Sequence, residues 1–220
     1  MLHNMTFDRQ DIYWWRPLEG DEASDTRGKI LHAAYQEIHV NGFQAASLNN
    51  ILARTGVTKG ALYHHFPNKT ALGYAVIDEV IARRIYLSFI QPLENTGHPV
   101  KALIELIEAS GQEFSLEDIQ LGCPLGNLVQ EMAPIDEGFR QRLARIYHQW
   151  YDAITGAIER AQQVGQVVTD IDPGQTAVMV VATMEGCLNS GMISRDKEQL
   201  LRCGGGLVRY LNMIQTPTEA

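Results

Sequence analysis

The stretch "TGVTKGALYHHFPNKTALG", residues 55–73, decides the fold of this chain. Gly56 closes a short segment with helical spacing, and Thr58 is a residue type that caps helix N-termini. Leu62 and Phe66 lie four residues apart and predict one buried face, and the proline that follows ends the element. The stretch therefore predicts the second half of a helix-turn-helix, with glycine at the turn.

The residues before this stretch supply the other helices of the motif. Ile30 and Ala34 begin a pattern with a four-residue period, which predicts a helix from Thr26 to the glycine of an Asn-Gly pair. Ser47 is expected to cap a short second helix that ends at Gly56. The predicted helix-turn-helix motif spans residues 47–66.

The rest of the chain also has helical patterns. A long fourth helix is predicted from Asn68 to Pro92, since asparagine caps helices and proline interrupts them. Further helices are predicted at about residues 100–113, 125–132, 136–163, 173–193 and 196–214. No segment has a convincing strand pattern, so the fold class is predicted to be all-α.

Charge is unevenly distributed along the 220 residues. The formal net charge is −8, but the segment from Thr26 to Thr70 has five basic residues and one acid, Glu37, which gives +4 and leaves −12 for the remainder. Nucleic-acid binding depends on lysine and arginine side chains that displace counterions from phosphate. The sequence therefore predicts a basic DNA-binding module on an acidic body.

The second helix of the motif has a polar face. Lys59, Gly60, Tyr63 and His64 are predicted to share an exposed side, where the second helix of a helix-turn-helix meets the major groove. His65 lies about 100° further around the helix and is expected to pack against the first helix. Outside this face, the side chains expected to be solvated and without partners are Asn50 and Arg54.

The segment "TRGKILHAAYQEIHVNGFQAASLNNILARTGVTKGALYHHFPNKTAL" resembles the TetR family of transcriptional regulators, and its "GVTKGALYHHFPNK" run is specific for that family. The resemblance covers about residues 24–84. It implies a DNA-binding domain at residues 24–84 and a helical ligand-binding and dimerisation domain at residues 85–220. Residues 1–23 are predicted to be a mostly irregular extension.

The resemblance also implies roles for individual residues. Base or phosphate contacts are implied for Thr58, Lys59, Gly60, Tyr63 and His64. Phosphate contacts are implied for Thr26, Arg27, Ser47, Asn49 and Lys69. The implied protein is a repressor that binds a palindromic operator as a homodimer and is released by a small-molecule or electrophilic inducer, which the sequence does not identify. The alternatives are an activator or an architectural nucleic-acid-binding protein without small-molecule control.

Two features of the body have two interpretations each. Gly204–Gly206 lie in the last helix, where they indicate either close packing against another backbone or a break in the helix. Several apolar side chains either line an inducer pocket or belong to a plain core. These side chains are Tyr86, Phe89, Phe114, Met132, Tyr147, Trp150, Tyr151 and Met184.

Cys123 lies in "GCPLGNL", a segment similar to one found in a TetR subgroup whose members include sensors of electrophiles. It is interpreted either as a reactive sensor thiol or as a small buried residue. Cys187 and Cys203 are distant from it in sequence, and no C-x-x-C pair is present. This spacing argues against a zinc site and against disulfides, so reduced thiols are expected.

Several other classes of function lack support in the sequence. The chain has no nucleophile elbow, phosphate-binding glycine loop or metal-ligand spacing, so neither enzymatic activity nor a metal or other cofactor is expected. No apolar run approaches the roughly 20 residues of a membrane span, and the N-terminus does not resemble a signal peptide. A cytoplasmic location without a membrane partner is predicted.

Overall fold

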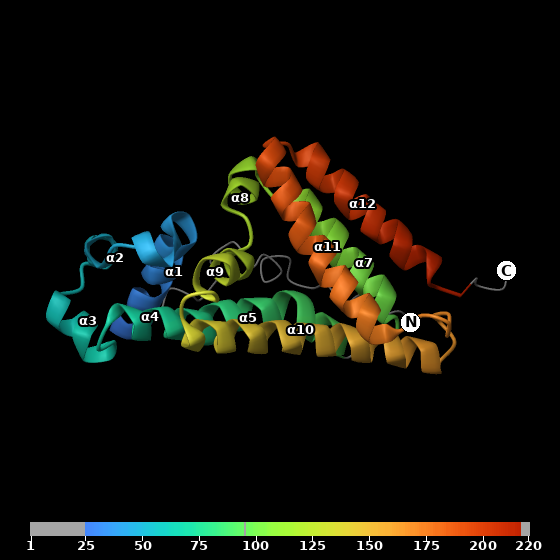
Figure 1. Cartoon of the computed structure of the whole chain (residues 1–220), viewed down its shortest axis with the longest axis horizontal. Helices are drawn as coiled ribbons and strands as arrows, with labels where there is room; N and C mark the ends of the chain where they lie inside the picture. Colours follow the sequence, from blue (N-terminus) through green and yellow to red (C-terminus); the bar gives the residue numbers. More distant parts are fainter. Residues whose placement is uncertain (1–24, 95, 217–220) are drawn as a thin grey trace. The chain divides into compact units, whose positions relative to one another are not determined.

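The computed structural model describes residues 25–94 and 96–216, and the named elements of these residues are all helices (Figure 1). The predicted all-α fold is confirmed. The chain forms two compact units. The first contains the described residues up to Ile85 together with Pro124–Arg145, and the second contains Tyr86–Cys123 and the described residues from Ile146 onward. The N-terminal extension predicted for residues 1–23 lies outside the described residues.

The first unit contains the predicted helix-turn-helix. Its elements are α1 (Thr26–Ala45), α2 (Leu48–Thr55), α3 (Lys59–His65), α4 (Lys69–Ala75), the π-helix η1 (Val76–Ile81), α5 (Ala82–Ile85), α9 (Pro124–Met132) and the start of α10 (Glu137–Gln163). Ser47, Thr58 and Asn68 cap α2, α3 and α4 as predicted, because each side chain accepts a hydrogen bond from a backbone N–H of the first turn.

Two glycines set the turns of this unit. Gly56 ends α2 with φ of 66°, a left-handed conformation that glycine adopts without a Cβ penalty, and it forms the predicted turn. Gly42 interrupts α1 with φ of 77°, at the position predicted to end the first helix. Just beyond it, the Glu131 carboxylate of α9 accepts hydrogen bonds from the backbone N–H groups of Phe43 and Gln44 at 2.7 and 2.8 Å.

Glu37 joins α1 to α2. Its side chain is only 1% exposed, and Oε1 accepts hydrogen bonds from the Ser47 backbone N–H at 3.1 Å and from Asn50 Nδ2 at 2.9 Å. The Arg54 guanidinium lies 3.5 Å from Oε2. Burial opposes the charged form, but the Asn50 and Ser47 hydrogen bonds, with Arg54, outweigh it and lower the pKa of the Glu37 carboxyl.

The second unit contains the body helices. They are the π-helix η2 (Tyr86–Ile90), α6 (Gln91–Glu94), α7 (Pro99–Glu113), α8 (Leu116–Leu121), the rest of α10, α11 (Pro173–Ser194) and α12 (Lys197–Met213). Helix α8 was not predicted from the sequence, although Ser115 and Asp118 form a capping box at its start. The prediction that Pro92 ends a helix is wrong, because α6 continues to Glu94. A proline removes one backbone N–H donor from a helix. The turns before Pro92, in η2, are π-helical and already depart from the α-helical hydrogen-bond pattern, so the loss of this one donor does not end the helix.

The helices α11 and α12 pack against each other, and α12 also packs against α7 (Figure 1). A disulfide joins Cys187 of α11 to Cys203 of α12, with the two Cα atoms 5.3 Å apart. The expectation of reduced thiols without disulfides is therefore wrong for this pair. The residues are 16 apart in sequence, but the hairpin of the two helices brings them together. Helix α12 is continuous through Gly204–Gly206, so the alternative of a broken helix is also wrong.

Among the described residues, α11 is the one helix that is long and apolar enough to cross a membrane by length and composition. It packs on α12 and α8. A core helix of a folded body passes the same test.

We predict that Glu37→Ala lowers the free energy of unfolding by about 2 kcal/mol, because it removes a buried acceptor from the Ser47 and Asn50 donors. The folded-state pKa of Glu37 is lowered, so its contribution is present above the unfolded-state pKa and is lost as pH falls through the folded-state value. Urea unfolding followed by circular dichroism at pH 7 and in acid measures both effects. The exposed Glu108→Ala is the matched control, and equal losses in the two variants would contradict the prediction.

Candidate functional site

The polar face of α3 is open to solvent. Thr58, Lys59, Gly60, Tyr63 and His64 are all exposed, and the Tyr63 side chain is 42% exposed. Lys59 Nζ lies 5.9 Å from the centroid of the Tyr63 ring, so these two side chains share one turn of the helix. Leu62 and Phe66 are buried as predicted. His65 is half-buried and packs beside Phe66, with ring centroids 6.3 Å apart.

Gly60 has no role in the packing of the first unit. A Cβ added there would meet only Thr58 Oγ1, at 4.0 Å. The backbone of Gly60 has no positive φ that would require glycine. The fold therefore accommodates alanine at this position.

Two basic residues with implied phosphate contacts hold the unit together. The Arg27 guanidinium forms a bidentate pair with Glu79 of η1, with Nη2 to Oε1 at 2.6 Å, and lies over the Phe66 ring. Hydrogen bonding within this pair raises the pKa of Arg27 and lowers the pKa of Glu79. Lys69 Nζ donates to the Gln44 carbonyl at 2.9 Å. Both cations are thus engaged by neighbouring helices.

The remaining residues with implied phosphate contacts lie at helix starts. Thr26 and Asn49 are exposed, whereas Ser47 is half-buried and caps α2. The expectation that Asn50 and Arg54 lack partners is wrong, because both pair with the buried Glu37 carboxylate. A lone acid in a basic segment was the signal that could have identified this contact.

The second unit contains a partly buried polar cluster around Glu185 of α11. Tyr147 Oη donates to Glu185 Oε1 at 3.2 Å, and the Cys123 thiol also donates a hydrogen bond to this carboxyl. Burial raises the pKa of Glu185 despite these two hydrogen bonds. Burial and the nearby Glu185 charge raise the pKa values of Tyr147 and Tyr151. Cys123 and Tyr147 were predicted as candidate sensor residues from the sequence, whereas Glu185 was not, because no local pattern distinguishes it.

Aromatic side chains adjoin this cluster. The Phe89 and Trp150 rings stack with centroids 4.8 Å apart, and Tyr147 lies 6.4 Å from Trp150. Trp150 is buried, and its Nε1 has no acceptor within the described part of the chain. Phe114 is buried and Met184 is half-buried in the same unit, whereas Met132 belongs to the first unit. Residues 25–94 and 96–216 contain no group of three or more side chains arranged to hold a metal ion.

Two family sequence profiles match this chain, one in its N-terminal part and one in its C-terminal part. The profile described as "Bacterial regulatory proteins, tetR family" matches residues 30–76, and "Tetracyclin repressor-like, C-terminal domain" matches residues 99–203. The chain belongs to the TetR family. It is therefore a DNA-binding transcriptional regulator of the helix-turn-helix type.

Known relatives agree with this assignment. The HTH-type transcriptional repressor DhaR of Mycobacterium sp. (strain GP1) is 26% identical over 181 residues, which cover 79% of this chain and 86% of the relative. Salmonella enterica GusR is 28% identical with a TM-score of 0.68, covering 88% and 96% of the two chains. A TetR regulator from Chloroflexus aurantiacus has a TM-score of 0.76 at 24% identity, covers 86% and 96%, and shares the fold.

In this TetR-family regulator, we predict that Gly60→Ala weakens specific DNA binding at least tenfold while the fold is retained. The new methyl group fits the folded chain but projects from the surface that is predicted to meet DNA. Helix stability should rise by up to about 1 kcal/mol, because alanine is the better helix former. Fluorescence anisotropy measures affinity and thermal unfolding measures stability. Gly97→Ala, at an exposed glycine where a Cβ would meet no atom within 4 Å, is the control, and unchanged affinity in Gly60→Ala would contradict the prediction.

Proposed function

We propose that this TetR-family protein is a cytoplasmic, ligand-responsive repressor that binds a palindromic operator as a homodimer and is released by a small-molecule inducer. The observation that carries this proposal is the exposed face of α3. Lys59, Tyr63 and His64 are exposed there beside a glycine that the fold does not need. Exposed polar side chains on the helix that reads the major groove in this motif support base recognition.

The proposed DNA contacts fall into two groups, one on the open face of α3 and one at the starts of helices. Thr58, Lys59, Gly60, Tyr63 and His64 are proposed to meet bases and adjacent phosphates, because their face of α3 is open. Thr26, Ser47, Asn49 and Lys69 are proposed to contact phosphates from helix starts. Arg27 is left out of this interface, since Glu79 already occupies two of its donors.

The dimer is proposed to form through α11 and α12. Val178, Ala182, Gly186 and Ile193 recur along one side of α11, and all four are exposed, Ile193 at 83%. On α12, Gly205, Gly206 and Met213 are also exposed, and Met213 is 74% exposed. Exposed apolar side chains beside small residues suit a helix-packing surface, and a two-fold dimer would present two α3 helices to successive major grooves.

The inducer is proposed to bind at the Glu185 cluster of the second unit. The Trp150 indole N–H is buried without an acceptor in the described residues, so a ligand carbonyl could accept its hydrogen bond. Phe89, Tyr147 and Trp150 would contact the apolar part of the ligand. Glu185 could accept a hydrogen bond from a ligand hydroxyl or amine.

An electrophilic inducer would react with Cys123 at this site. The thiol is only 5% exposed and donates to Glu185, which supports proton transfer to that carboxylate as sulfur attacks a carbon electrophile. In this proposal Glu185 acts as the base that takes up the thiol proton.

Selection of bound DNA from a random pool tests the proposed operator recognition. We expect the full-length protein to enrich a palindrome with half-sites one or more helical turns apart, because two symmetry-related α3 helices would read it. Affinity for this site should fall steeply with added salt. Enrichment of a single half-site without symmetry would contradict the dimeric mode, and the absence of any enriched sequence would contradict specific recognition.

We predict that Glu185→Gln slows the modification of Cys123 by a small α,β-unsaturated aldehyde by roughly tenfold or more, since glutamine cannot accept the thiol proton. In the wild-type protein the rate should fall as pH drops through the raised pKa of Glu185, because the protonated carboxyl no longer accepts a proton. Peptide mapping by mass spectrometry measures the rate. The exposed Glu159→Gln, from α10, is the control, and equal rates in wild type and Glu185→Gln would remove Glu185 from this role.

A further inference from the structure

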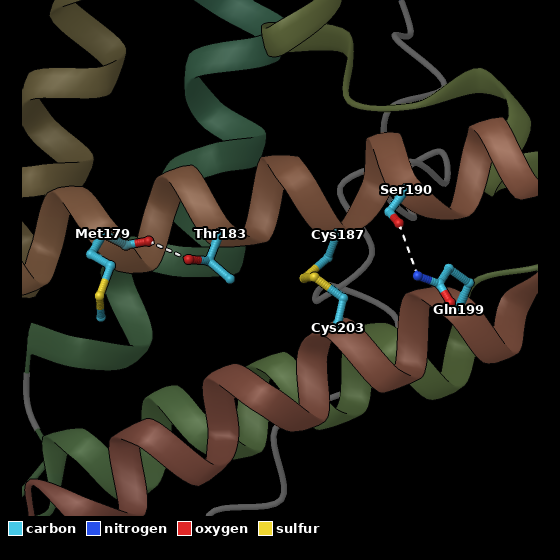
Figure 2. The surroundings of a disulfide bond; sticks show 6 residues. All are labelled: Met179, Thr183, Cys187, Ser190, Gln199 and Cys203. Carbon is cyan, nitrogen blue, oxygen red and sulfur yellow. Dashed lines mark hydrogen bonds between the residues drawn. A yellow bond between two sulfur atoms is a disulfide. The ribbon is translucent and has the colours of Figure 1, made fainter.

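The Cys187–Cys203 disulfide lies between α11 and α12 and is not explained by DNA or inducer binding. Figure 2 shows the two side chains pointing toward each other from the two helices. Cys187 is 3% exposed, whereas Cys203 is half-buried. One turn away, Gln199 Nε2 and Ser190 Oγ are 3.3 Å apart and link the same two helices (Figure 2). The disulfide is thus part of the contact between α11 and α12.

Hydrogen bonds hold both ends of α12, whereas the disulfide joins its middle to α11. Near its start, Lys197 Nζ donates to the Gln112 carbonyl. Just beyond its end, the Thr216 backbone N–H donates to the Gln166 carbonyl at 3.0 Å. Between these two hydrogen bonds, Cys203 is followed directly by Gly204–Gly206. A Cβ at Gly205 or Gly206 would meet no atom within 4 Å, and glycine is a poor helix former.

We propose that Cys187 and Cys203 form a reversible thiol–disulfide redox site that controls how firmly the middle of α12 is held against α11. A disulfide within a protein of the reducing cytoplasm is typically transient and redox-sensing rather than structural. The cytoplasmic location and the effect on the dimer rest on the proposed function, whereas the redox chemistry of the pair does not.

The reductant is a low-molecular-weight thiol such as glutathione. Its thiolate attacks the more accessible sulfur, Cys203 Sγ, the S–S bond breaks, and Cys187 leaves as a thiolate that takes up a proton. A second glutathione attacks the mixed disulfide and releases the Cys203 thiol together with glutathione disulfide. Two electrons pass from two glutathione molecules to the protein disulfide. Glutathione disulfide, acting as oxidant, reverses both steps.

Reduction would loosen the surface proposed for the dimer. Gly186 of α11 and Gly205 of α12 are exposed near the two cysteines in sequence, on the faces assigned to the partner subunit. With the link broken, the glycine segment of α12 would be held by non-covalent contacts alone. The oxidised protein is therefore expected to dimerise more tightly than the reduced protein.

Equilibration of the full-length protein in a series of glutathione to glutathione disulfide ratios tests the redox site. After acid quenching and alkylation, peptide mapping by mass spectrometry reports Cys187, Cys203 and Cys123 separately. We expect the pair to change together from disulfide to dithiol within the series while the protein stays folded by circular dichroism. A bond that persists at every ratio until the protein unfolds is structural and overturns the proposal, as does a pair that remains reduced at every ratio.

Thermal unfolding and sedimentation test the conformational effect. Reduction should lower Tm by about 5–10 °C, as expected for the loss of a cross-link that closes a loop of this length in a chain of this size. It should also raise the dimer dissociation constant several-fold. Cys203→Ser and Cys203→Ala should both match the reduced wild type and no longer respond to glutathione. Equal Tm and equal dimerisation in the two redox states would overturn the proposal that the disulfide controls how firmly α12 is held against α11. Operator selection is measured separately, so its failure would refute the proposed function without changing the redox result.

Discussion

The arrangement of the helix-turn-helix depends on one buried charge, the carboxylate of Glu37. A charged group inside a protein is stable only when hydrogen bonds and opposite charge replace its hydration. Here the replacement comes from the start of α2, through the Ser47 backbone and Asn50, and from Arg54 at its end. The carboxylate therefore fixes both ends of α2 against α1. Since a short glycine turn joins α2 to α3, this contact also orients the face that carries Lys59 and Tyr63.

The pKa values of the buried Glu37 and the half-buried Glu185 are shifted in opposite directions, and the difference follows from their partners. Glu37 receives donors that include a backbone N–H and a guanidinium, and its pKa is lowered. Glu185 receives only the weaker donors Tyr147 and Cys123, and burial raises its pKa. A carboxylate that stays ionised suits a permanent structural contact. A carboxyl whose proton is easily gained or lost suits a site that must respond to a ligand or a reacting thiol.

Local sequence rules predicted the parts of this protein that depend on neighbouring residues. The caps at Ser47, Thr58 and Asn68 and the turn at Gly56 each involve groups within a few positions, and all four were predicted correctly. The contacts of Glu37 and Glu185 join residues 10 or more positions apart, so no local pattern contains them. The exposed face of α3 was predicted because helical periodicity places Leu62 and Phe66 inward. Its contacts with DNA remain predictions.

The disulfide shows how a helical hairpin can be recognised from sequence once its turn is known. Cys187 lies seven residues before the end of α11 at Ser194, and Cys203 lies six residues after the start of α12 at Lys197. Positions at similar distances from the turn face each other in an antiparallel pair, and Ser190 and Gln199, four residues before the end of α11 and two after the start of α12, also meet. Gly186 and Gly205 lie within two residues of the cysteines, and both are exposed. Any change in the Cys187–Cys203 bond therefore acts next to the glycine segment of α12, which is also part of the surface that the proposed partner subunit would touch.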